Sequence, residues 1–284
     1  MIRKGIGELV RKLFVRSLLK SNRNRGEAAL KQRLMEIVPD ISRQYTTFCV
    51  DSDDTYLTEK VRTQHAFQIG LALKAIHMFI GASENRRVNI IDIGDSSGTH
   101  LRYLNELAKE HDIEIMSMSV NLDPEAVRKI SGYGLPVVQC RAEEIHLVKG
   151  GIEADIFLSY EMLEHLFDPI NFLHSIACDS TCSYFVITVP YLKRSRVGLH
   201  HIRQGSTGNV CAENTHIFEL CPEDWDLIYE FSGWEVLLRD CYTQYPERGF
   251  LHMMKYFWRR TDFDGFYGVI LKRNHEKAKQ YKNW

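Results

Sequence analysis

Acids and histidines that can move a proton follow apolar segments of this 284-residue chain. Glu161 and His165 come just after the apolar run Asp155–Ser159, four residues apart, so the spacing of one helical turn would let them interact. A histidine titrates near neutral pH and can accept the proton of an attacking hydroxyl group. We therefore take His165 as the first candidate for a general base. His216 is a rival candidate, and each histidine could instead have a structural role.

A second candidate site is the segment Val88–His100 (VNIIDIGDSSGTH), where an apolar run leads into a glycine turn. Gly94 lets the backbone approach a ligand, and Gly98 permits a tight turn into the next helix. A dinucleotide-binding loop needs G-x-G-x-x-G with a later acid, and a phosphate-binding loop needs Gly-Lys-Ser/Thr; neither is present. The polar residues of the turn are Asp92, Asp95 and Ser96.

The elements that must position these residues are read from the apolar periodicity. From Val88 onward, short apolar runs alternate with amphipathic segments, which predicts βαβ units and a parallel sheet. We expect strands at Val88–Ile93, Ile113–Val120, Val137–Gln139, Asp155–Ser159, Tyr184–Val189, Trp234–Asp240 and Phe266–Lys272. We expect helices at Thr99–Lys109, Pro124–Ser131, Pro169–Ala177 and Pro222–Phe231. The candidate residues then stand at strand ends, where open α/β sheets bind ligands.

Residues 1–85 are predicted to form a helical extension, and residues 86–284 the α/β domain. The extension has a polar break at Asp51–Thr55 and a long amphipathic helix at Leu57–Ile80. Its first part, Met1–Arg25, holds eight Lys and Arg against the single Glu8. Such a basic amphipathic helix can lie on an anionic membrane, pack in a homodimer or remain mobile, and a mitochondrial presequence also fits the composition.

The composition excludes several classes of protein. The chain is 44% hydrophobic and 26% charged, as in an ordinary globular protein, and its net charge of -1 argues against general nucleic-acid binding. The seven cysteines form no CxxC pair, which favours reduced thiols in a cytoplasmic protein. There is no uninterrupted apolar run of membrane-spanning length. Because histidines and acids show no ligand-type spacing along the chain, we expect no metal site.

The order of motifs over about 88–272 resembles the class I S-adenosylmethionine-dependent methyltransferase family. The glycine turn resembles its D-x-G-x-G-x-G motif, with Ser96 in place of the middle glycine. Ala154–Ile176 resembles the family's fourth strand and next helix, Phe185–Tyr191 its fifth strand, and Asn214–Val236 its His-x-Phe and Gly-Trp-Glu-Val segments. The stretch is similar to small-molecule members of this family, such as sugar O-methyltransferases and quinone-pathway methyltransferases. The resemblance implies a Rossmann-like seven-stranded mixed sheet of five parallel strands plus a C-terminal antiparallel hairpin.

The resemblance also implies S-adenosylmethionine as cofactor and assigns roles around the turn. Asn121, followed by Leu122, takes the place of the acid that binds the ribose hydroxyls, and an amide is a weaker acceptor. Arg141 stands where an acid is usual, so adenine recognition falls to Ala142 and Glu143. Tyr160 is expected beside the sulfonium. Arg62 could pair with the cofactor carboxylate, or be an ordinary exposed helix residue.

The acceptor is the least determined part of the sequence interpretation. The stretch Tyr191–Ala212 carries a set of cations and no acid, namely Lys193, Arg194, His200, His201, Arg196 and Arg203. It is either a lid over an anionic acceptor or a solvated loop. We expect a small-molecule O-methyltransferase acting on a glycan or cell-envelope precursor. A catalytically weak binding or assembly protein is the alternative, because Ser96, Asn121 and Arg141 depart from the motifs; a macromolecular methyltransferase is disfavoured.

Overall fold

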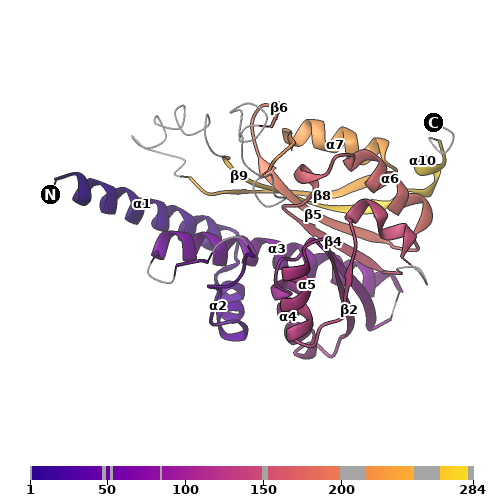
Figure 1. Cartoon of the computed structure of the whole chain (residues 1–284), viewed down its shortest axis with the longest axis horizontal. Helices are drawn as coiled ribbons and strands as arrows, with labels where there is room; N and C mark the ends of the chain where they lie inside the picture. Colours follow the sequence, from indigo (N-terminus) through magenta and orange to yellow (C-terminus); the bar gives the residue numbers. More distant parts are fainter. Residues whose placement is uncertain are drawn as a thin grey trace.

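A seven-stranded mixed sheet forms the centre of the protein (Figure 1). The computed structural model describes residues 2–46, 49–51, 54–83, 85–148, 153–198, 215–245 and 263–280. The strands of this sheet are β1 (Arg87–Ile93), β2 (Glu114–Asn121), β3 (Val137–Gln139), β4 (Ile156–Tyr160), β5 (Tyr184–Tyr191), β8 (Trp234–Thr243) and β9 (Gly265–Arg273). A separate two-stranded ribbon consists of β6 (Arg196–Val197) and β7 (Phe218–Glu219).

The order of the strands is β3-β2-β1-β4-β5-β9-β8. The first five are parallel, whereas β9 runs antiparallel to β5 and β8 antiparallel to β9. This confirms the predicted five parallel strands with a C-terminal antiparallel hairpin. The chain reverses its direction of travel across the sheet between β1 and β4, and such a switch point opens a crevice at the carboxyl ends of the two strands.

The helices form a layer on each side of the sheet (Figure 1). Their bounds are α1 (Ile2–Asn24), α2 (Ala28–Ile37), α3 (Thr55–Ser83), α4 (Thr99–Lys109), α5 (Pro124–Gly132), α6 (Pro169–Asp179), α7 (Pro222–Phe231) and α10 (His275–Gln280). Two short 3-10 helices are η1 (Ala142–Leu147) and η2 (Leu163–His165). The side-chain carboxylates of Asp123 and Asp168 cap α5 and α6, each of which has a proline in its first turn.

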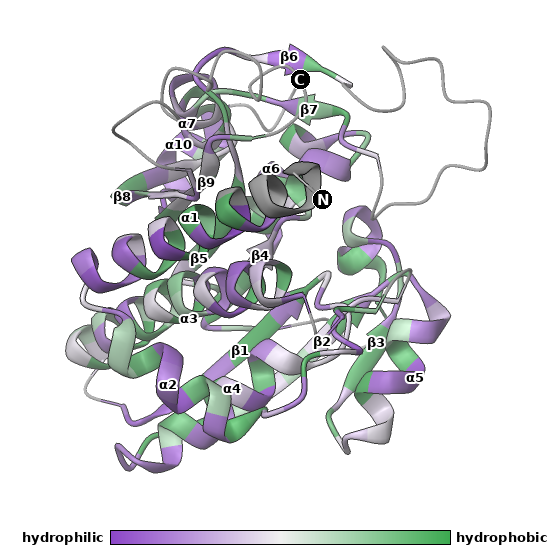
Figure 2. Ribbon diagram, turned by 90° about the vertical axis from the view of Figure 1, so that its left-hand side faces the viewer, coloured by the Kyte–Doolittle hydropathy of each residue, from purple (hydrophilic) through white to green (hydrophobic). Residues whose placement is uncertain are grey.

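Alternation along the strands divides the core into two hydrophobic clusters. In β5, Val186 belongs to the cluster that includes α3 and α4, while Phe185 and Ile187 belong to the one that includes α6 and α7. This is the period-two pattern of strands that are buried on both faces. The amphipathic character of the covering helices is visible as alternating purple and green along their length (Figure 2).

The expected helix at Leu57–Ile80 is longer in the structure, as α3, and belongs to the core. It contacts β1, β4, β5 and β9, and thirteen of its residues are buried. Among the described residues it is the one helix long and apolar enough to cross a membrane, with 44% of the relevant window buried. The predicted polar break at Asp51–Thr55 is shorter than the observed one, since the described residues between α2 and α3 are non-helical. Pro39 stops α2, because the residue before a proline avoids helical geometry.

The basic N-terminal segment predicted to be helical forms α1. Its second half packs on α3, with Leu18 fully buried and the Phe14 ring 5.7 Å from that of Tyr56 in a tilted arrangement. Its N-terminal end projects from the body (Figure 1). Arg25, just after α1, donates to both carboxylate oxygens of Asp240 on β8 at 2.6 and 2.7 Å. This ion pair attaches the extension to the edge strand of the sheet.

Candidate functional site

The glycine turn lies at the carboxyl end of β1, as the sequence predicts. Gly94 has φ +93° and Gly98 has φ +75°, in the left-handed region that favours glycine. A Cβ atom on Gly94 would lie 2.9 Å from Cγ of Met162, and one on Gly98 would lie 2.9 Å from a methyl group of Leu135. Both glycines are therefore required by the local backbone and by close neighbours.

Three buried side chains, Asp92, Asp95 and His100, form what we call the glycine-turn cluster. Nδ1 of His100 lies 3.2 Å from a carboxylate oxygen of Asp92 and 3.9 Å from one of Asp95. Burial, followed by the neighbouring Asp95 charge, raises the pKa of Asp92 to about 6. Burial lowers the pKa of His100, but the Asp95 and Asp92 carboxylates outweigh it and raise that pKa overall. One oxygen of each aspartate is buried without a hydrogen-bond partner among the described residues.

Tyr160, at the end of β4, lies next to this cluster. Its ring is 4.8 Å from that of His100, and its hydroxyl donates to the backbone carbonyl of Gln68 on α3 at 3.1 Å. Burial, and then the aspartate charges, raise the pKa of Tyr160 well above its usual value. His65 contacts His100 from α3, and burial lowers its pKa well below the usual value, so this ring is neutral. The glycine-turn cluster is thus enclosed by polar groups from α3 and β4.

A segment of the extension covers the glycine turn. Ser96 donates to the carbonyl of Gln44 at 2.7 Å, and Ser97 donates to the side chain of Gln44 at 3.1 Å. Lys129 on α5 donates to the carbonyl of Tyr45 at 2.8 Å. Ser96, which replaces the expected middle glycine of the motif, therefore attaches the turn to the extension.

Arg62 is buried, in contrast to the exposed alternative considered from sequence. Its guanidinium donates to the carbonyls of Val38 and Pro39, both at 2.5 Å, and lies 3.5 Å from the Tyr103 hydroxyl. In this structure Arg62 therefore holds the chain that follows α2. Pairing with a cofactor carboxylate stays a prediction and would require it to exchange these partners.

The residues predicted to contact ribose and adenine lie at the ends of β2 and β3. The side chain of Asn121 donates to the Asp95 carbonyl at 3.0 Å and accepts from the Asp123 amide at 2.8 Å, so it supports the glycine turn. Leu122 is 49% exposed, and Ala142 and Glu143 are half-buried at the start of η1. Leu122, Ala142 and Glu143 are thus accessible to a ligand at this edge of the sheet.

The segment after β4 has an unusual backbone. Glu161 adopts φ +53°, which is uncommon for a residue other than glycine and is a form of strain found at functional sites. The chain then enters the short 3-10 helix η2, so the regular helical turn expected between Glu161 and His165 is absent. Burial raises the pKa of Glu161 to about 8, although Thr188 and Lys60 act in the opposite direction. Glu164 and His165 both lie in this 3-10 helix.

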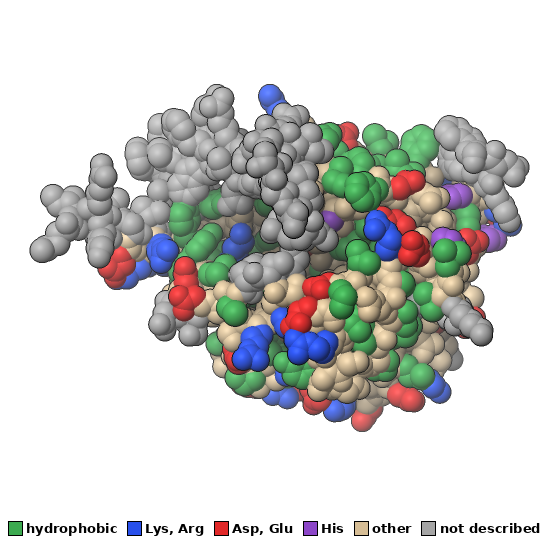
Figure 3. Space-filling view, in the orientation of Figure 1, with side chains coloured by type: hydrophobic (Ala, Val, Ile, Leu, Met, Phe, Trp, Pro, Cys, Tyr) green, Lys and Arg blue, Asp and Glu red, His purple; other side chains and the backbone are tan. Residues whose placement is uncertain are grey.

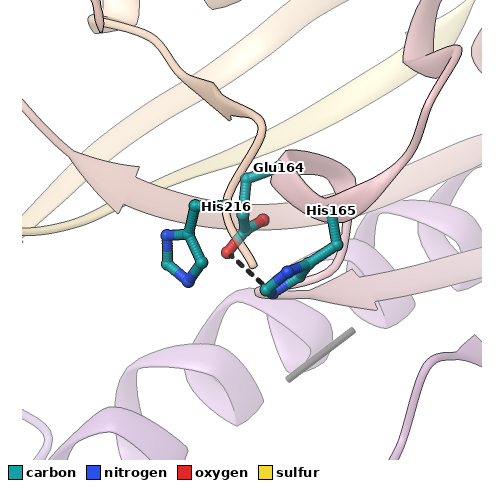
Figure 4. A group of neighbouring side chains, drawn as sticks. All are labelled: Glu164, His165 and His216. Carbon is teal, nitrogen blue, oxygen red and sulfur yellow. Dashed lines mark ion pairs between the residues drawn. The ribbon is translucent and has the colours of Figure 1, made fainter. Parts of the chain in front are cut away.

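Glu164, His165 and His216 converge in a second group, which we call the two-histidine cluster. One possible ligand atom from each residue lies within 4.8 Å of the others. The Glu164 carboxylate lies between the two rings in Figure 4, with its Oε1 atom 3.8 Å from Nε2 of His165. The ring centroids of His165 and His216 are 4.7 Å apart, at 89°. The two candidate bases predicted from sequence are therefore neighbours.

Glu164 is fully buried and neither of its carboxylate oxygens has a hydrogen-bond partner among the described residues. Burial, and then the charges of Glu161 and Glu219, raise the pKa of Glu164 well above its usual value. Glu219, on β7, is also fully buried and accepts from Nε of Arg196 at 2.5 Å. Arg196, predicted to belong to a basic lid, instead joins β6 to β7. His200, His201 and Arg203 lie outside the described residues.

Sequence reasoning missed Glu164, Glu219 and the pairing of His100 with Asp92. It also expected no metal site, because acids and histidines are not clustered along the chain. The structure brings the carboxylate of Glu164 and the imidazoles of His165 and His216 together. They meet because the backbone carbonyl of Thr215, which precedes His216, accepts a hydrogen bond from His165, fifty residues earlier in the sequence. The local signal in the sequence was that Glu164 directly precedes His165 and follows Glu161 by three residues, which places two acids and a histidine in one short segment.

No protein-family model matches the chain, and no curated protein matches it in sequence. Among solved structures it is similar to a protein assigned as a sarcosine dimethylglycine methyltransferase from Galdieria sulphuraria, with 13% identity over 86% of this chain and 98% of that one and a TM-score of 0.53. It is also similar to a chain of the complex between the Haloferax volcanii Trm112 methyltransferase activator and a candidate methyltransferase, with 14% identity, 75% and 92% coverage and a TM-score of 0.51.

A third similar structure is the 1,6-didemethyltoxoflavin-N1-methyltransferase of Burkholderia thailandensis, with bound 1,6-didemethyltoxoflavin and S-adenosylhomocysteine. Its identity is 14% over 73% of this chain and 80% of that one, at a TM-score of 0.48. At these identities the first two likenesses, with TM-scores of 0.53 and 0.51, establish the fold. The chain has the Rossmann-like fold of the S-adenosylmethionine-dependent methyltransferases, as the order of its sequence motifs predicts.

Proposed function

We propose that this chain, with its methyltransferase fold, binds S-adenosylmethionine and transfers the methyl group to a small-molecule acceptor. The observation that carries the proposal is the glycine-turn cluster, at the switch point between β1 and β4. Its buried aspartates each keep one oxygen without a partner among the described residues. S-adenosylmethionine carries an ammonium and a sulfonium group, so it suits a pocket with excess buried negative charge. Gly94, with φ +93°, packs the backbone of the turn closely against Met162 and fixes the position of the two aspartates.

The cofactor, when bound, supplies a methyl group on a positively charged sulfur. The chain's own part is to orient the partners and exclude water, which are the main sources of rate in such a displacement. Asp92 and Asp95 would face the cationic groups, Tyr160 would lie beside them, and Leu122 with Ala142 would border the adenine. Glu161 and the two-histidine cluster follow Tyr160 in the fold and would border the acceptor.

Oxygen is the acceptor atom that the two-histidine cluster favours, because a hydroxyl nucleophile must lose a proton. Nδ1 of His165 lies 2.6 Å from the carbonyl oxygen of Thr215, which can only accept, so this nitrogen is the donor. Nε2 then carries the lone pair and can receive a proton. We extend the proposal to an anionic acceptor, such as a glycan or cell-envelope precursor, because Lys193 and Arg194 are exposed where β5 leads to β6.

Isothermal titration calorimetry with S-adenosylmethionine and S-adenosylhomocysteine tests cofactor binding. We expect saturable binding of both, and absence of binding at millimolar concentration would refute the proposal. Incubation with methyl-labelled cofactor and pools of hydroxylated metabolites then tests transfer. Label found only on amines would exclude an oxygen acceptor but leave methyl transfer intact.

A binding or assembly protein with weak catalysis is the second candidate. The observation that favours it is the attachment of the glycine turn to Gln44 through Ser96 and Ser97. If this attachment keeps the cofactor out, calorimetry shows no binding to the full chain, and Gln44→Gly with Ser96→Gly restores it. Cofactor binding by the unaltered chain would contradict this alternative.

We further propose a cytoplasmic protein whose α1 contacts an anionic membrane surface or a second copy of the chain. Leu9 is 60% exposed on the projecting half of α1, among basic residues. On the face shown in Figure 3, by contrast, acidic and basic side chains are mixed over the described surface. We expect the unaltered protein to float with anionic liposomes and the Leu9→Glu variant to remain unbound. Sedimentation of both proteins should show whether the same change dissociates a dimer. Equal flotation of both proteins would exclude membrane contact through Leu9.

A further inference from the structure

We propose that Glu164, His165 and His216 bind a divalent first-row transition-metal ion, with Glu161 supplying a second carboxylate. The ligand atoms of the first three residues already lie within 4.8 Å of one another. Figure 4 shows the Glu164 carboxylate directed into the space between the two imidazole rings. This inference concerns ion binding and does not require methyl transfer, but it assigns His165 the role of a ligand in place of that of a base.

Glu164 provides the strongest argument for a bound cation. Its side chain is fully buried, and both carboxylate oxygens lack a hydrogen-bond partner among the described residues. Burying an ionised carboxylate without a partner is costly, and buried charges in proteins are paired or coordinate metals. The acid is further surrounded by acids, because Glu161 and Glu219 both act on it electrostatically. A cation bound among these carboxylates would offset the cost of burying their charge.

His165 is arranged as metal-binding histidines usually are. Its Nδ1 donates to the Thr215 carbonyl at 2.6 Å, so the Nε2 lone pair faces Glu164. Two ligands at bonds of about 2.1 Å and a tetrahedral angle are about 3.4 Å apart. The observed 3.8 Å between Nε2 of His165 and Oε1 of Glu164 requires only a small contraction.

His216 is brought to the site by the β6–β7 ribbon. The amide of Ile217 donates to the carbonyl of Glu164 at 2.7 Å, which links the two ligand-bearing segments directly. Nδ1 of His216 lies 3.7 Å from Oε1 of Glu219, and Arg196 holds the same carboxylate through its other oxygen. A carboxylate behind a histidine ligand orients the ring and strengthens it as a ligand. The other nitrogen of His216, Nε2, is then the ligand.

The set of donors indicates the class of ion. Two neutral imidazoles with two carboxylates balance a charge of +2. Imidazole suits Zn²⁺, Fe²⁺ and Ni²⁺, while carboxylate suits Mn²⁺ and Mg²⁺, so a mixed set favours Mn²⁺, Co²⁺ or Zn²⁺ over Mg²⁺ or Ca²⁺. Sites with few protein ligands keep open positions for water or a substrate oxygen. If a metal binds, His165 is a ligand rather than a free base.

The glycine-turn cluster is a weaker metal candidate. It too has ligand atoms within 4.8 Å, but it contains a single histidine. Nδ1 of His100 is already engaged by Asp92 at 3.2 Å, so this imidazole is paired with a carboxylate. His100 therefore serves as the control position for the experiment.

The test uses the full chain after removal of metal with EDTA. Titration with Mn²⁺ followed by electron paramagnetic resonance, and with Co²⁺ followed by visible absorption, should each show one equivalent bound. We expect binding to weaken at least tenfold in Glu164→Gln and in His216→Asn, and to be unchanged in His100→Asn. Co²⁺ bound to imidazole nitrogen has ligand-field absorption that distinguishes it from loose surface binding.

Folding of the variants is checked by thermal denaturation without metal. Without metal, Glu164→Gln should be about as stable as the unaltered protein, because glutamine keeps the size of the side chain and carries no charge. Added Mn²⁺ should then stabilise only the unaltered protein. The proposal is overturned if the unaltered chain binds neither ion, if binding survives the double change of Glu164 and His216, or if it depends on His100.

Discussion

The glycine-turn cluster is fully buried and the two-histidine cluster is partly buried. Both combine acids with histidine near the carboxyl ends of neighbouring strands, yet they differ in how their charges are balanced. In the first, His100 is bonded to Asp92, and all members come from the continuous segment 92–100. In the second, the members come from two distant segments, and the central Glu164 has no hydrogen-bond partner among the described residues.

From this difference we infer that the glycine-turn cluster binds a ligand and that the two-histidine cluster takes part in the reaction. The glycine-turn cluster is already partly neutralised by His100 and is held by a tightly packed turn, which suits a cationic ligand held in place. The two-histidine cluster has histidine lone pairs and unbalanced carboxylates, which suit proton transfer or metal binding. Changes in the first cluster should therefore alter cofactor affinity, whereas changes in the second should alter turnover.

The largest expected effect is on turnover in the two-histidine cluster. His165→Ala should lower kcat by about 10²- to 10⁴-fold, the usual contribution of a positioned acid–base group. The dissociation constant for S-adenosylmethionine should stay the same, because His165 belongs to the other cluster. Steady-state kinetics and calorimetry on the same preparation measure the two quantities. A parallel loss of cofactor affinity would show that the clusters are not separate.

The next effect is on cofactor affinity at the glycine turn. In Gly94→Ala the new Cβ would meet Met162 at 2.9 Å with φ at +93°, and strain of this kind costs about 1–3 kcal/mol. The dissociation constant for S-adenosylmethionine should rise roughly tenfold or more, since about 1.4 kcal/mol corresponds to a factor of ten. Gly132→Ala is the matched control, because nothing lies within 4 Å of its Cβ position. Unchanged affinity in Gly94→Ala would remove the turn from the binding site.

The same contrast explains how much the sequence could predict. The glycine-turn cluster is local, so an apolar strand followed by Gly94 and Gly98 was enough to locate it and to predict the carboxyl end of β1. The alternation of strands and helices predicted the seven-stranded sheet for the same reason, because period and turn signals are local properties. The cap of α5 is local too, because the side chain of Asp123 accepts from the Glu125 amide at 2.9 Å.

The two-histidine cluster depends on contacts that no local pattern encodes. His216 was a candidate base, but its position beside His165 requires the ribbon of β6 and β7, each only two residues long. Such short strands have no detectable periodicity. Arg196 was assigned from sequence to either a lid or a solvated loop, whereas in the structure it donates to the buried Glu219 on the other strand. Ser96 was seen as a missing glycine, and only the fold shows that it binds Gln44.

A smaller effect concerns the pH dependence of stability in the glycine-turn cluster. The folded-state pKa of Asp92 is raised to about 6, so the protonated form is favoured in the fold and this stabilisation is lost as pH rises from about 4 to above 6. The raised pKa of His100 acts in the same direction, because its contribution is present at low pH and is lost as pH rises through the folded pKa.

Relative to Asp92→Asn, the unaltered protein should therefore lose about 2–3 kcal/mol of unfolding free energy between pH 4 and pH 7. Urea denaturation of both proteins at several pH values, without cofactor, measures this difference. Asparagine keeps the size of the side chain and its bonding to His100. If the difference stays constant with pH, Asp92 is not held in a protonated state by its surroundings.

The smallest expected effect concerns the acceptor at the edge of the two-histidine cluster. If the acceptor is anionic, the double change Lys193→Glu and Arg194→Glu should raise its KM by about two- to fivefold, because exposed charges interact weakly through water. The effect should shrink at high salt, where such charges are screened. The matched control is Lys277→Glu with Lys279→Glu on α10, which reverses the same charges on a distant helix. An equal KM for the two double variants would mean that the charge of the acceptor is not recognised by Lys193 and Arg194. The acceptor would then be recognised through its neutral hydroxyl group at the two-histidine cluster.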